Sequence, residues 1–488
     1  MRSSVDLPVS LSRDSDVPLT TQLSDWLRAA MRAGTLPAGE RLPSSRGLAR
    51  QLGVSRTVVT EAYQQLYAEG WLDGRHGSGT FVTDLTVQPR EAPPEPVRQA
   101  PARPPARRGP ARQLINLTPG EPWVHDYDNA AWKRAWRKAA ELPPGNDPDP
   151  HGLPHLRELL AAHLRRARAV PAGAENILVT RGTGNGLDLV ALALLGHGTR
   201  AGVEEPGYRV ARNVFAARGA EVVPCPVDED GVIVEELPDD LDVLYTTPAH
   251  QYPLGGRLPI PRRERLLAWA DRTGALIVED DYDAEFRYDV APLPALYGLD
   301  PSRVVLLGTL SKTLAPDVGV GWLVGSPGLV DAIARRRDDV SDRTSGPVQQ
   351  AVVNLLDRGD LERHLRRMRL EYARRRAAVV EILGPVCRLR GDTAGLHVLA
   401  ELPGEAVPKI VDMARDRGVC LDSVERYHYG RPRVHGLVIG YGSASLADVR
   451  RGCRIVAELV TELGVAGPDV AGPDVAGPGV TTGPGAAS

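Results

Sequence analysis

The sequence has little cysteine, no long hydrophobic run and almost no net charge. Its four cysteines are far apart and form no CxxC pair, so neither a disulfide framework nor a zinc or other metal site is expected. No stretch approaches about 18 consecutive apolar residues, and the N-terminus lacks the apolar core of a signal peptide, which favours a cytoplasmic protein without a membrane partner. A net charge of −3 over 488 residues means that any nucleic-acid-binding surface must be local.

Proline-rich and glycine-rich segments divide the chain. Residues 85–113 are dense in proline and poor in large apolar side chains, which predicts a semi-rigid linker. This linker has six arginines and two glutamates, a net charge of +4, and this charge either stays solvated or contacts DNA phosphates. Residues 464–488 repeat a short unit of Gly, Pro and small residues, and we expect a disordered tail. An N-terminal domain at 15–84 and a larger domain at 114–463 remain.

The larger domain alternates helical patterns with short apolar runs. Helices are predicted at 153–170 and 262–274. Between the helical patterns lie runs of three to five apolar residues, as expected for strands buried on both faces: 177–179, 241–245, 275–278 and 304–307. This alternation predicts an α/β domain with a mostly parallel central sheet, in which ligands bind beyond the carboxyl ends of the strands.

The N-terminal domain is predicted to contain three helices and a β-hairpin. Ser44 or Ser45 can cap a second helix, Gly53 makes a turn, and Ser55 can cap a third helix. The hairpin has a glycine-rich, basic tip at residues 75–79. This is the arrangement of a winged helix-turn-helix, in which the second helix of the motif begins in the DNA major groove.

Reactive side chains follow two of the apolar runs in the larger domain. Three carboxylates at 279–281 and the phenol of Tyr282 follow one run, and Thr309, Ser311 and Lys312 follow another. A lysine, an acid and a phenol at neighbouring strand ends are the groups that pyridoxal 5′-phosphate (PLP) requires, for the Schiff base, the ring nitrogen and the ring oxygen. A lone lysine at a strand end is usually just solvated, so the prediction depends on the joint pattern.

Two further segments suit the same cofactor. In TRGTGNGLDL, Gly182 and Thr183 stand at a helix start, where backbone N–H groups can bind a phosphate. In VEEPGYRVAR, Tyr208 follows a Pro-Gly turn and could stack on the pyridine ring or simply pack at the surface. Neither segment is specific alone.

The N-terminal domain resembles the winged-helix domain of GntR-type bacterial regulators. The resemblance covers residues 17–83 through PAGERLPSSRGLARQLGVSRTVVTEAY and GRHGSGTFV. It implies that DNA is contacted by Arg46, Ser55, Arg56, Thr57, His76 and Gly77. Whether each arginine contacts a phosphate or a guanine edge stays open, and an interaction module that binds no DNA is the alternative.

The larger domain resembles fold-type I aminotransferases through VTRGTGNGLDL, VEEPGYRVAR, TPAHQYPLGG, VEDDYDAEFRYD, LGTLSKTLAP and RHLRRMRLEYARRR. Behind a GntR-type domain, these motifs resemble the MocR/GabR group of PLP-binding transcriptional regulators over residues 17 to about 460. The resemblance implies Lys312 as the Schiff-base lysine, Asp280 at the pyridine nitrogen and Tyr282 at the ring oxygen. It further implies phosphate contacts from Thr183, Thr309 and Ser311, stacking by Tyr208, and a homodimer.

One position departs from this group. Gly319 stands seven residues after the lysine, where many members have an arginine that binds the phosphate. Loss of one such charge-assisted contact should cost about 1.5 to 3 kcal/mol of cofactor binding. Weaker binding suits a sensor better than an enzyme that must stay loaded. For an effector carboxylate, Arg433 and Arg209 are the preferred candidates, with Arg212 and Arg431 as alternatives.

These observations lead to a DNA-binding regulator that senses PLP, or an amino acid or amine joined to PLP as an aldimine. It would control genes of vitamin B6 or of amino-acid or amine metabolism. The alternatives are an active aminotransferase that carries a DNA-binding module, and a DNA-binding protein whose aminotransferase domain serves only dimerisation. At most a residual or half-transamination activity is expected.

Overall fold

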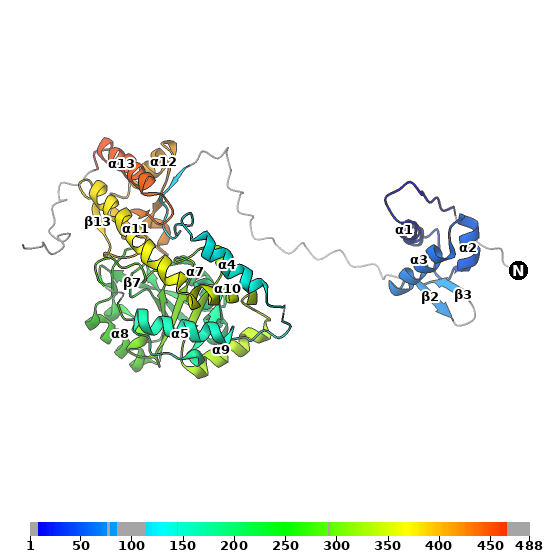
Figure 1. The fold of residues 1–488 in the computed structure, drawn as a ribbon, viewed down its shortest axis with the longest axis horizontal. Coiled ribbons are helices and arrows are strands. Elements are labelled where there is room, and N and C mark those ends of the chain that lie inside the picture. The colour runs from blue at the N-terminus through cyan, green and yellow to red at the C-terminus, as the bar shows by residue number, and fades with distance from the viewer. Residues whose placement is uncertain (1–7, 76–78, 85–113, 144, 291–292, 466–488) are drawn as a thin grey trace, which may run out of the picture. The chain divides into compact units, whose positions relative to one another are not determined.

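The structure, a computed structural model, describes residues 8–75, 79–84, 114–143, 145–290 and 293–465 (Figure 1). The chain divides into two compact units, Met1–Arg107 and Arg108–Ser488. The predicted linker at 85–113 and most of the predicted tail lie outside the described residues, so the predicted domain bounds stay predictions.

The N-terminal unit has three helices and a small antiparallel sheet. The helices are α1 (Leu19–Arg32), α2 (Ser45–Leu52) and α3 (Arg56–Ala68), and the sheet has the order β1 (Arg41–Leu42), β3 (Gly79–Val82), β2 (Leu72–Arg75). Apolar residues from all three helices and from the sheet form one core, including Leu27, Leu48, Val59, Leu66 and Val82. The three helices and the hairpin predicted from the sequence are therefore present.

Serine caps fix where the second and third helices begin. The Ser44 hydroxyl accepts a hydrogen bond from the Gly47 N–H at 3.1 Å, and the Ser55 hydroxyl accepts one from the Val58 N–H at 3.4 Å. Each cap satisfies an N–H group that the helix leaves without an internal partner. Between these helices, Gly53 has φ +63°, a left-handed conformation that favours glycine.

The larger unit is built on an eight-stranded sheet. Its strands are, in spatial order, β5 (Ile177–Thr180), β12 (Gly321–Val324), β11 (Val304–Thr309), β10 (Leu276–Asp281), β9 (Val243–Thr246), β6 (Arg200–Glu205), β7 (Glu221–Asp228) and β8 (Gly231–Val232). The pairs among β11, β10, β9, β6 and β7 are all parallel, whereas β12 is antiparallel to both neighbours and β8 is antiparallel to β7. The predicted α/β class with a mostly parallel sheet is confirmed.

Helices cover both faces of this sheet. Successive strand residues point to opposite faces, and because both sets are apolar, each face packs against helices. Leu178, Val305 and Leu307 pack into one apolar core, while Val179 and Leu306 pack into the other. The helices of this part are α4 (Asn129–Ala140), α5 (Pro154–Arg168), α6 (Thr183–Leu194), α7 (Arg209–Ala217), α8 (Ile260–Thr273), α9 (Pro327–Asp339) and α10 (Gly346–Asp357). Strands this buried need no polar face, so they contain the short apolar runs seen in the sequence.

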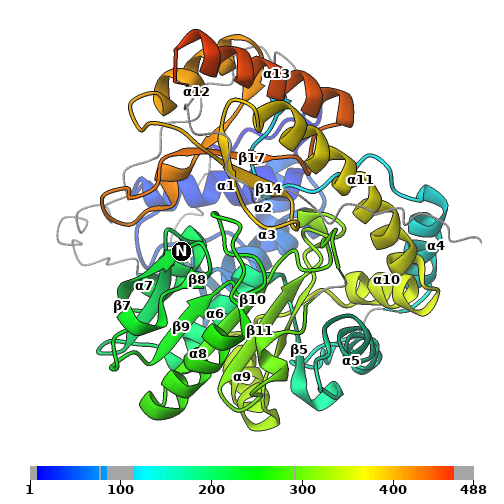
Figure 2. The ribbon, with the colours of Figure 1, turned by 90° about the vertical axis from the view of Figure 1, so that its left-hand side faces the viewer.

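A smaller α+β part completes this unit. The long helix α11 (Asp360–Leu383) leads to a sheet of order β13 (Arg388–Arg390), β14 (His397–Glu401), β17 (Gly436–Gly440), β16 (Asp422–Ser423). Two short strands, β4 (Ile115–Asn116) and β15 (Val419–Cys420), pair in parallel beside it. The helices α12 (Val407–Asp416) and α13 (Leu446–Glu462) lie at the opposite end of the unit from α8 and α9 (Figure 2). Among the described helices, none is both long enough and apolar enough to span a membrane.

Candidate cofactor cavity and DNA-binding surface

A cavity of about 300 Å³ opens at the carboxyl ends of the parallel strands. Sequence reasoning placed eight residues at a cofactor site, and all eight line this cavity: Gly182, Thr183, Tyr208, Asp280, Tyr282, Thr309, Ser311 and Lys312. The remaining lining residues are Gly120, Arg181, Gly184, Asn185, Tyr245, Tyr252, Pro316, Leu396 and His397. The structure therefore gathers all eight candidates around one cavity.

Lys312 lies in the loop after β11, three residues beyond Thr309. Its ammonium group donates a hydrogen bond to the carbonyl of Gly120, a residue far away in the sequence. Burial lowers the pKa of Lys312, and this effect outweighs the opposing pull of the Asp283 and Asp280 carboxylates. A lowered pKa raises the fraction of neutral amine, which is the nucleophilic form that attacks an aldehyde.

Alternation along β10 separates the three carboxylates that the sequence places together. The sequence suggested that the three carboxylates follow the strand. In the structure β10 continues through Asp281, so all three lie within the strand. Glu279 accepts hydrogen bonds from the N–H groups of Leu296 and Tyr297 at 2.8 and 2.9 Å. Asp281 pairs with buried Arg168 through two bonds of 2.7 and 2.8 Å. These two carboxylates support the fold, and Asp280 between them faces the cavity.

Asp280 is 4% exposed and is held by two hydroxyl groups. The Tyr245 hydroxyl donates to it at 2.7 Å and the Thr183 hydroxyl at 3.4 Å. Burial raises the pKa of Asp280 to about 7, although these hydrogen bonds and the Lys312 charge act in the opposite direction. A carboxylate so placed is suited to bind a protonated ring nitrogen, because that cation would replace the water that burial has removed.

Tyr245 was not among the predicted residues. It lies in β9, a strand whose other residues were interpreted only as buried core. The available signal was a tyrosine in a fully buried run, since a buried hydroxyl requires a hydrogen-bonding partner.

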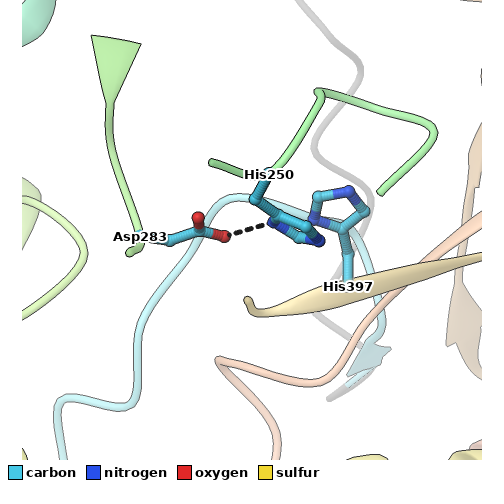
Figure 3. A group of neighbouring side chains, drawn as sticks. All are labelled: His250, Asp283 and His397. Carbon is cyan, nitrogen blue, oxygen red and sulfur yellow. Dashed lines mark hydrogen bonds and ion pairs between the residues drawn. The ribbon is translucent and has the colours of Figure 1, made fainter. Parts of the chain in front are cut away.

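The phenol of Tyr282 belongs to a hydrogen-bonded network. Its hydroxyl donates to the His250 carbonyl at 3.1 Å and lies 3.0 Å from Nδ1 of His250. Nδ1 of His250 also contacts Asp283 at 2.9 Å, and the imidazole of His397 lies beside it with ring centroids 4.9 Å apart (Figure 3). Burial holds the pKa of His397 well below its usual value.

His250, Asp283 and His397 are close enough to be candidate metal ligands, with one ligand atom from each within 4.8 Å of the others. All three groups already have protein partners, because His250 bonds Asp283 and Nε2 of His397 contacts the Pro253 carbonyl at 3.2 Å. We therefore interpret the group as the support that orients Tyr282 at the cavity wall. The absence of a metal stays a prediction.

The start of α6 is a candidate anion-binding end of the cavity. Gly182 precedes the helix with φ +101°, and a Cβ there would lie 3.3 Å from the Thr309 hydroxyl and 3.5 Å from the Ser311 hydroxyl. These two hydroxyls bond each other at 2.9 Å. Glycine therefore lets the first backbone N–H groups of α6 and both hydroxyls approach the same point, which suits a phosphate.

Tyrosine rings form another wall. Tyr208 lies 6.3 Å from Tyr245 between centroids, at an interplanar angle of 27°, and Tyr252 meets it edge-on at 6.1 Å. Tyr252 was missed as a site residue although its motif had been noted. Together with the acid, the phenol, the lysine and the anion-binding end, these rings match each group of PLP: the pyridine nitrogen, the ring oxygen, the aldehyde, the phosphate and the aromatic face.

The predicted effector arginines lie elsewhere in this structure. Arg433 is exposed, and neither Arg433 nor Arg209 lines the cavity. Their role stays a prediction.

The N-terminal unit presents its candidate DNA-binding side chains to solvent. Arg46 lies in the first turn of α2, and Ser55, Arg56 and Thr57 lie at the start of α3; all four are exposed. The start of α3, the second helix of the motif, is the position that contacts base edges in helix-turn-helix proteins, whereas Arg46 lies in the first helix of the motif. His76 and Gly77 lie outside the described residues.

Family comparisons agree with both units. Residues 19–82 match the family "Bacterial regulatory proteins, gntR family", and residues 112–434 match "Aminotransferase class I and II". The chain is 38% identical to the HTH-type pyridoxine biosynthesis transcriptional regulator PdxR of Corynebacterium glutamicum, over 90% of this chain and 95% of the relative. It is 35% identical to the probable rhizopine catabolism regulatory protein MocR of Rhizobium meliloti, over 91% and 94% of the two chains.

Solved structures resemble the larger unit. An archaeal alanine:glyoxylate aminotransferase superposes with a TM-score of 0.67 at 25% identity, covering 72% of this chain and 91% of its own. The kynurenine aminotransferase of Pyrococcus horikoshii gives a TM-score of 0.65 at 26% identity, with the same two coverages.

Proposed function

The chain belongs to the MocR-type transcriptional regulators, in which a gntR-family DNA-binding domain precedes a class I and II aminotransferase domain, and from this premise we propose that it is a PLP-dependent regulator. It binds promoter DNA and senses PLP, or an amino acid or amine attached to PLP. The observation that supports this best is the cavity itself, which combines Lys312, Asp280, Tyr282 and the start of α6 in a chain that also carries a helix-turn-helix.

The predicted cofactor residues each have a role in this proposal. PLP, when bound, would supply an aldehyde for amines and an electron-withdrawing ring. Lys312 would hold the cofactor through its amine, Asp280 would hold a proton at the ring nitrogen, and Tyr282 would turn its hydroxyl from the His250 carbonyl to the ring oxygen. Gly182, Thr183, Thr309 and Ser311 would hold the phosphate, and the ring of Tyr208 would pack against the pyridine.

The names of two relatives suggest which genes are under control. One relative is named for pyridoxine biosynthesis and another for rhizopine catabolism. We therefore propose control of vitamin B6 or of amino-acid or amine metabolism genes. Arg46, Ser55, Arg56, Thr57, His76 and Gly77 contact the promoter in this proposal.

The proposal includes a homodimer in the bacterial cytoplasm. Dimeric regulators bind paired half-sites, so a second copy doubles the readable sequence. An amino-acid effector would be bound through its carboxylate by Arg433 or Arg209, after a rearrangement that brings one of them to the cavity.

A promoter-binding assay tests the regulator directly. Fluorescently labelled DNA from upstream of the gene and of its divergent neighbour is titrated with the full chain, with and without PLP. We expect PLP to change the affinity or the stoichiometry of the complex. Binding to neither fragment under both conditions, or identical binding with a protein that stays colourless in PLP, contradicts the proposal.

Attachment at Lys312 can be mapped without ambiguity, since the chain has only four lysines, Lys133, Lys138, Lys312 and Lys409. Borohydride reduction of the PLP-treated protein followed by peptide mass spectrometry should label Lys312. Label on exposed Lys409 instead would show that the cavity is not the cofactor site.

The runner-up function is an active aminotransferase, favoured by the complete set of Lys312, Asp280 and Tyr282. It predicts many turnovers of an amino donor with a keto acid. One turnover or none per subunit supports the regulator instead.

A further inference from the structure

The phosphate end of the cavity carries hydroxyls and N–H groups, but little positive charge. Gly319, where an arginine is expected, ends the short 3-10 helix Pro316–Val318 with φ +59°. A Cβ at this position would meet only the Asp317 carbonyl oxygen at 4.0 Å, so no side chain packs directly against it. A phosphate dianion is bound most strongly by a cation in addition to neutral donors.

Among the residues that line the cavity, two carry a positive charge, Lys312 and Arg181. Lys312 is reserved for the aldehyde, which leaves Arg181. Arg181 directly precedes Gly182, and its N–H donates to the Asn185 side chain in the first turn of α6 at 3.0 Å. Its backbone is therefore fixed to the same turn that offers N–H groups to the phosphate.

The guanidinium of Arg181 has a partner that can release it. It pairs with the Asp342 carboxylate and donates to the Arg343 carbonyl at 3.2 Å. Asp342 keeps two other donors, Nε of Arg337 and Nδ2 of Asn185, both at 3.2 Å. Because Arg337 is 1% exposed and paired while the Arg181 side chain is 50% exposed, Arg181 can turn without leaving Asp342 unpaired.

We propose that Arg181 binds the cofactor phosphate in place of the arginine missing at Gly319, and that Asp342 holds its guanidinium beside the cavity until the phosphate binds. The charge reaches the phosphate from the β5–α6 turn rather than from the loop after Lys312. This inference rests on the proposed PLP binding and adds a residue to it. Its specific consequence is a preference for the phosphorylated cofactor.

The test compares PLP with pyridoxal, which lacks the phosphate. The dissociation constants of both are measured by absorbance titration of the full chain and of R181A. We expect R181A to weaken PLP binding about 3- to 30-fold. This is the effect of losing one charged hydrogen bond, reduced because solvent screens the half-exposed Arg181 side chain. Pyridoxal binding should change less than about twofold, because it has no group for Arg181 to bind. R181K should lie between, since lysine keeps the charge but not the planar fork.

Arg343→Ala is the matched control. Arg343 is a neighbouring arginine paired with Asp338, and it does not line the cavity. The variant removes the same charge and should leave PLP binding unchanged.

A second variant restores the missing charge. Adding G319R to R181A should recover PLP affinity while leaving pyridoxal unaffected, even if the left-handed backbone at 319 lowers stability. Thermal unfolding without PLP identifies any variant that is not folded.

Three outcomes overturn the inference: R181A binds PLP as the wild type does, R181A and R343A weaken PLP equally, or R181A weakens pyridoxal as much as PLP. A wild-type protein that binds no PLP would instead contradict the proposed function.

Discussion

Arg46 and Arg56 of the N-terminal unit are exposed at helix starts, whereas Asp280 of the larger unit is 4% exposed and bonded by two hydroxyls. In the proposed function, Arg46 and Arg56 stay hydrated until they bind DNA, so they need only to be presented on a stable helix. The proposed role of Asp280 at the cofactor depends on surroundings that have removed water and raised its pKa. Changes around the DNA-binding side chains should therefore matter little, while changes behind the cofactor groups should matter a great deal.

The largest effect is expected from Lys312→Ala. Without the amine no covalent attachment is possible, so the visible absorbance of the PLP-treated protein should disappear. DNA affinity measured without PLP should stay within about twofold, because Lys312 and the proposed DNA-binding residues belong to different units of the chain. Absorbance spectroscopy and fluorescence anisotropy check the two halves of this prediction. Lys409→Ala is the control, and loss of DNA binding in K312A alone would show that the regions are not separable.

Asp280→Asn should stabilise the cofactor-free protein at high pH. An acid whose pKa is raised from 3.8 to about 7 binds more protons in the folded than in the unfolded state between these values. Stability therefore falls as pH rises from about 4 to about 7 and then levels off, a cost of about 4 kcal/mol.

The asparagine variant avoids that cost, so its melting temperature should exceed the wild-type value at pH 8 and match it near pH 4. Exposed Asp147→Asn should show no such difference. Equal melting temperatures of D280N and wild type at pH 8 would mean that the carboxylate is not penalised by burial.

Arg56→Ala should weaken promoter binding about 5- to 100-fold. If Arg56 contacts a phosphate, the slope of log affinity against log salt concentration should also become shallower by about one. PLP binding should not change. Arg388→Ala, which removes an exposed charge from the larger unit, is the control for a general charge effect. Anisotropy titrations at several salt concentrations give both the DNA affinity and its salt dependence. An equal loss of DNA affinity in R56A and R388A would argue against a specific DNA contact.

Tyr245→Phe should produce the smallest effect, about 2- to 10-fold in PLP affinity. The Tyr245 hydroxyl lowers the pKa of Asp280, so its removal should raise that pKa further. PLP titrations at a series of pH values should therefore show that the pH at which PLP affinity changes is higher in this variant than in the wild type. Tyr208→Phe is the control: the Tyr208 hydroxyl is not one of the two that bond Asp280, so its removal should leave that pH unchanged.

Local pattern was sufficient for the elements and for several site residues. Ser44 and Ser55 predicted helix starts because capping is a local interaction. Lys312, Asp280 and Thr309 were identified because parallel strands end at one edge of the sheet, where their following residues meet.

Other features depended on distant parts of the chain. Nothing local distinguishes Asp280 from Glu279 and Asp281; the strand alternation and the partners Arg168, Leu296 and Tyr297 do so. Gly120 reaches Lys312, and His397 reaches His250, across long sequence separations.

The sequence by itself determined the family, the helix-turn-helix, the parallel sheet and the set of groups able to bind PLP, because these follow from short motifs and hydrophobic periodicity. Only the tertiary structure decided which carboxylate faces the cavity, which tyrosine is hydrogen-bonded to it and that Arg181 is one of the residues lining the cavity. The physical reason is that burial and hydrogen bonding set the charge state of a group, and both come from residues that meet only when the chain has folded.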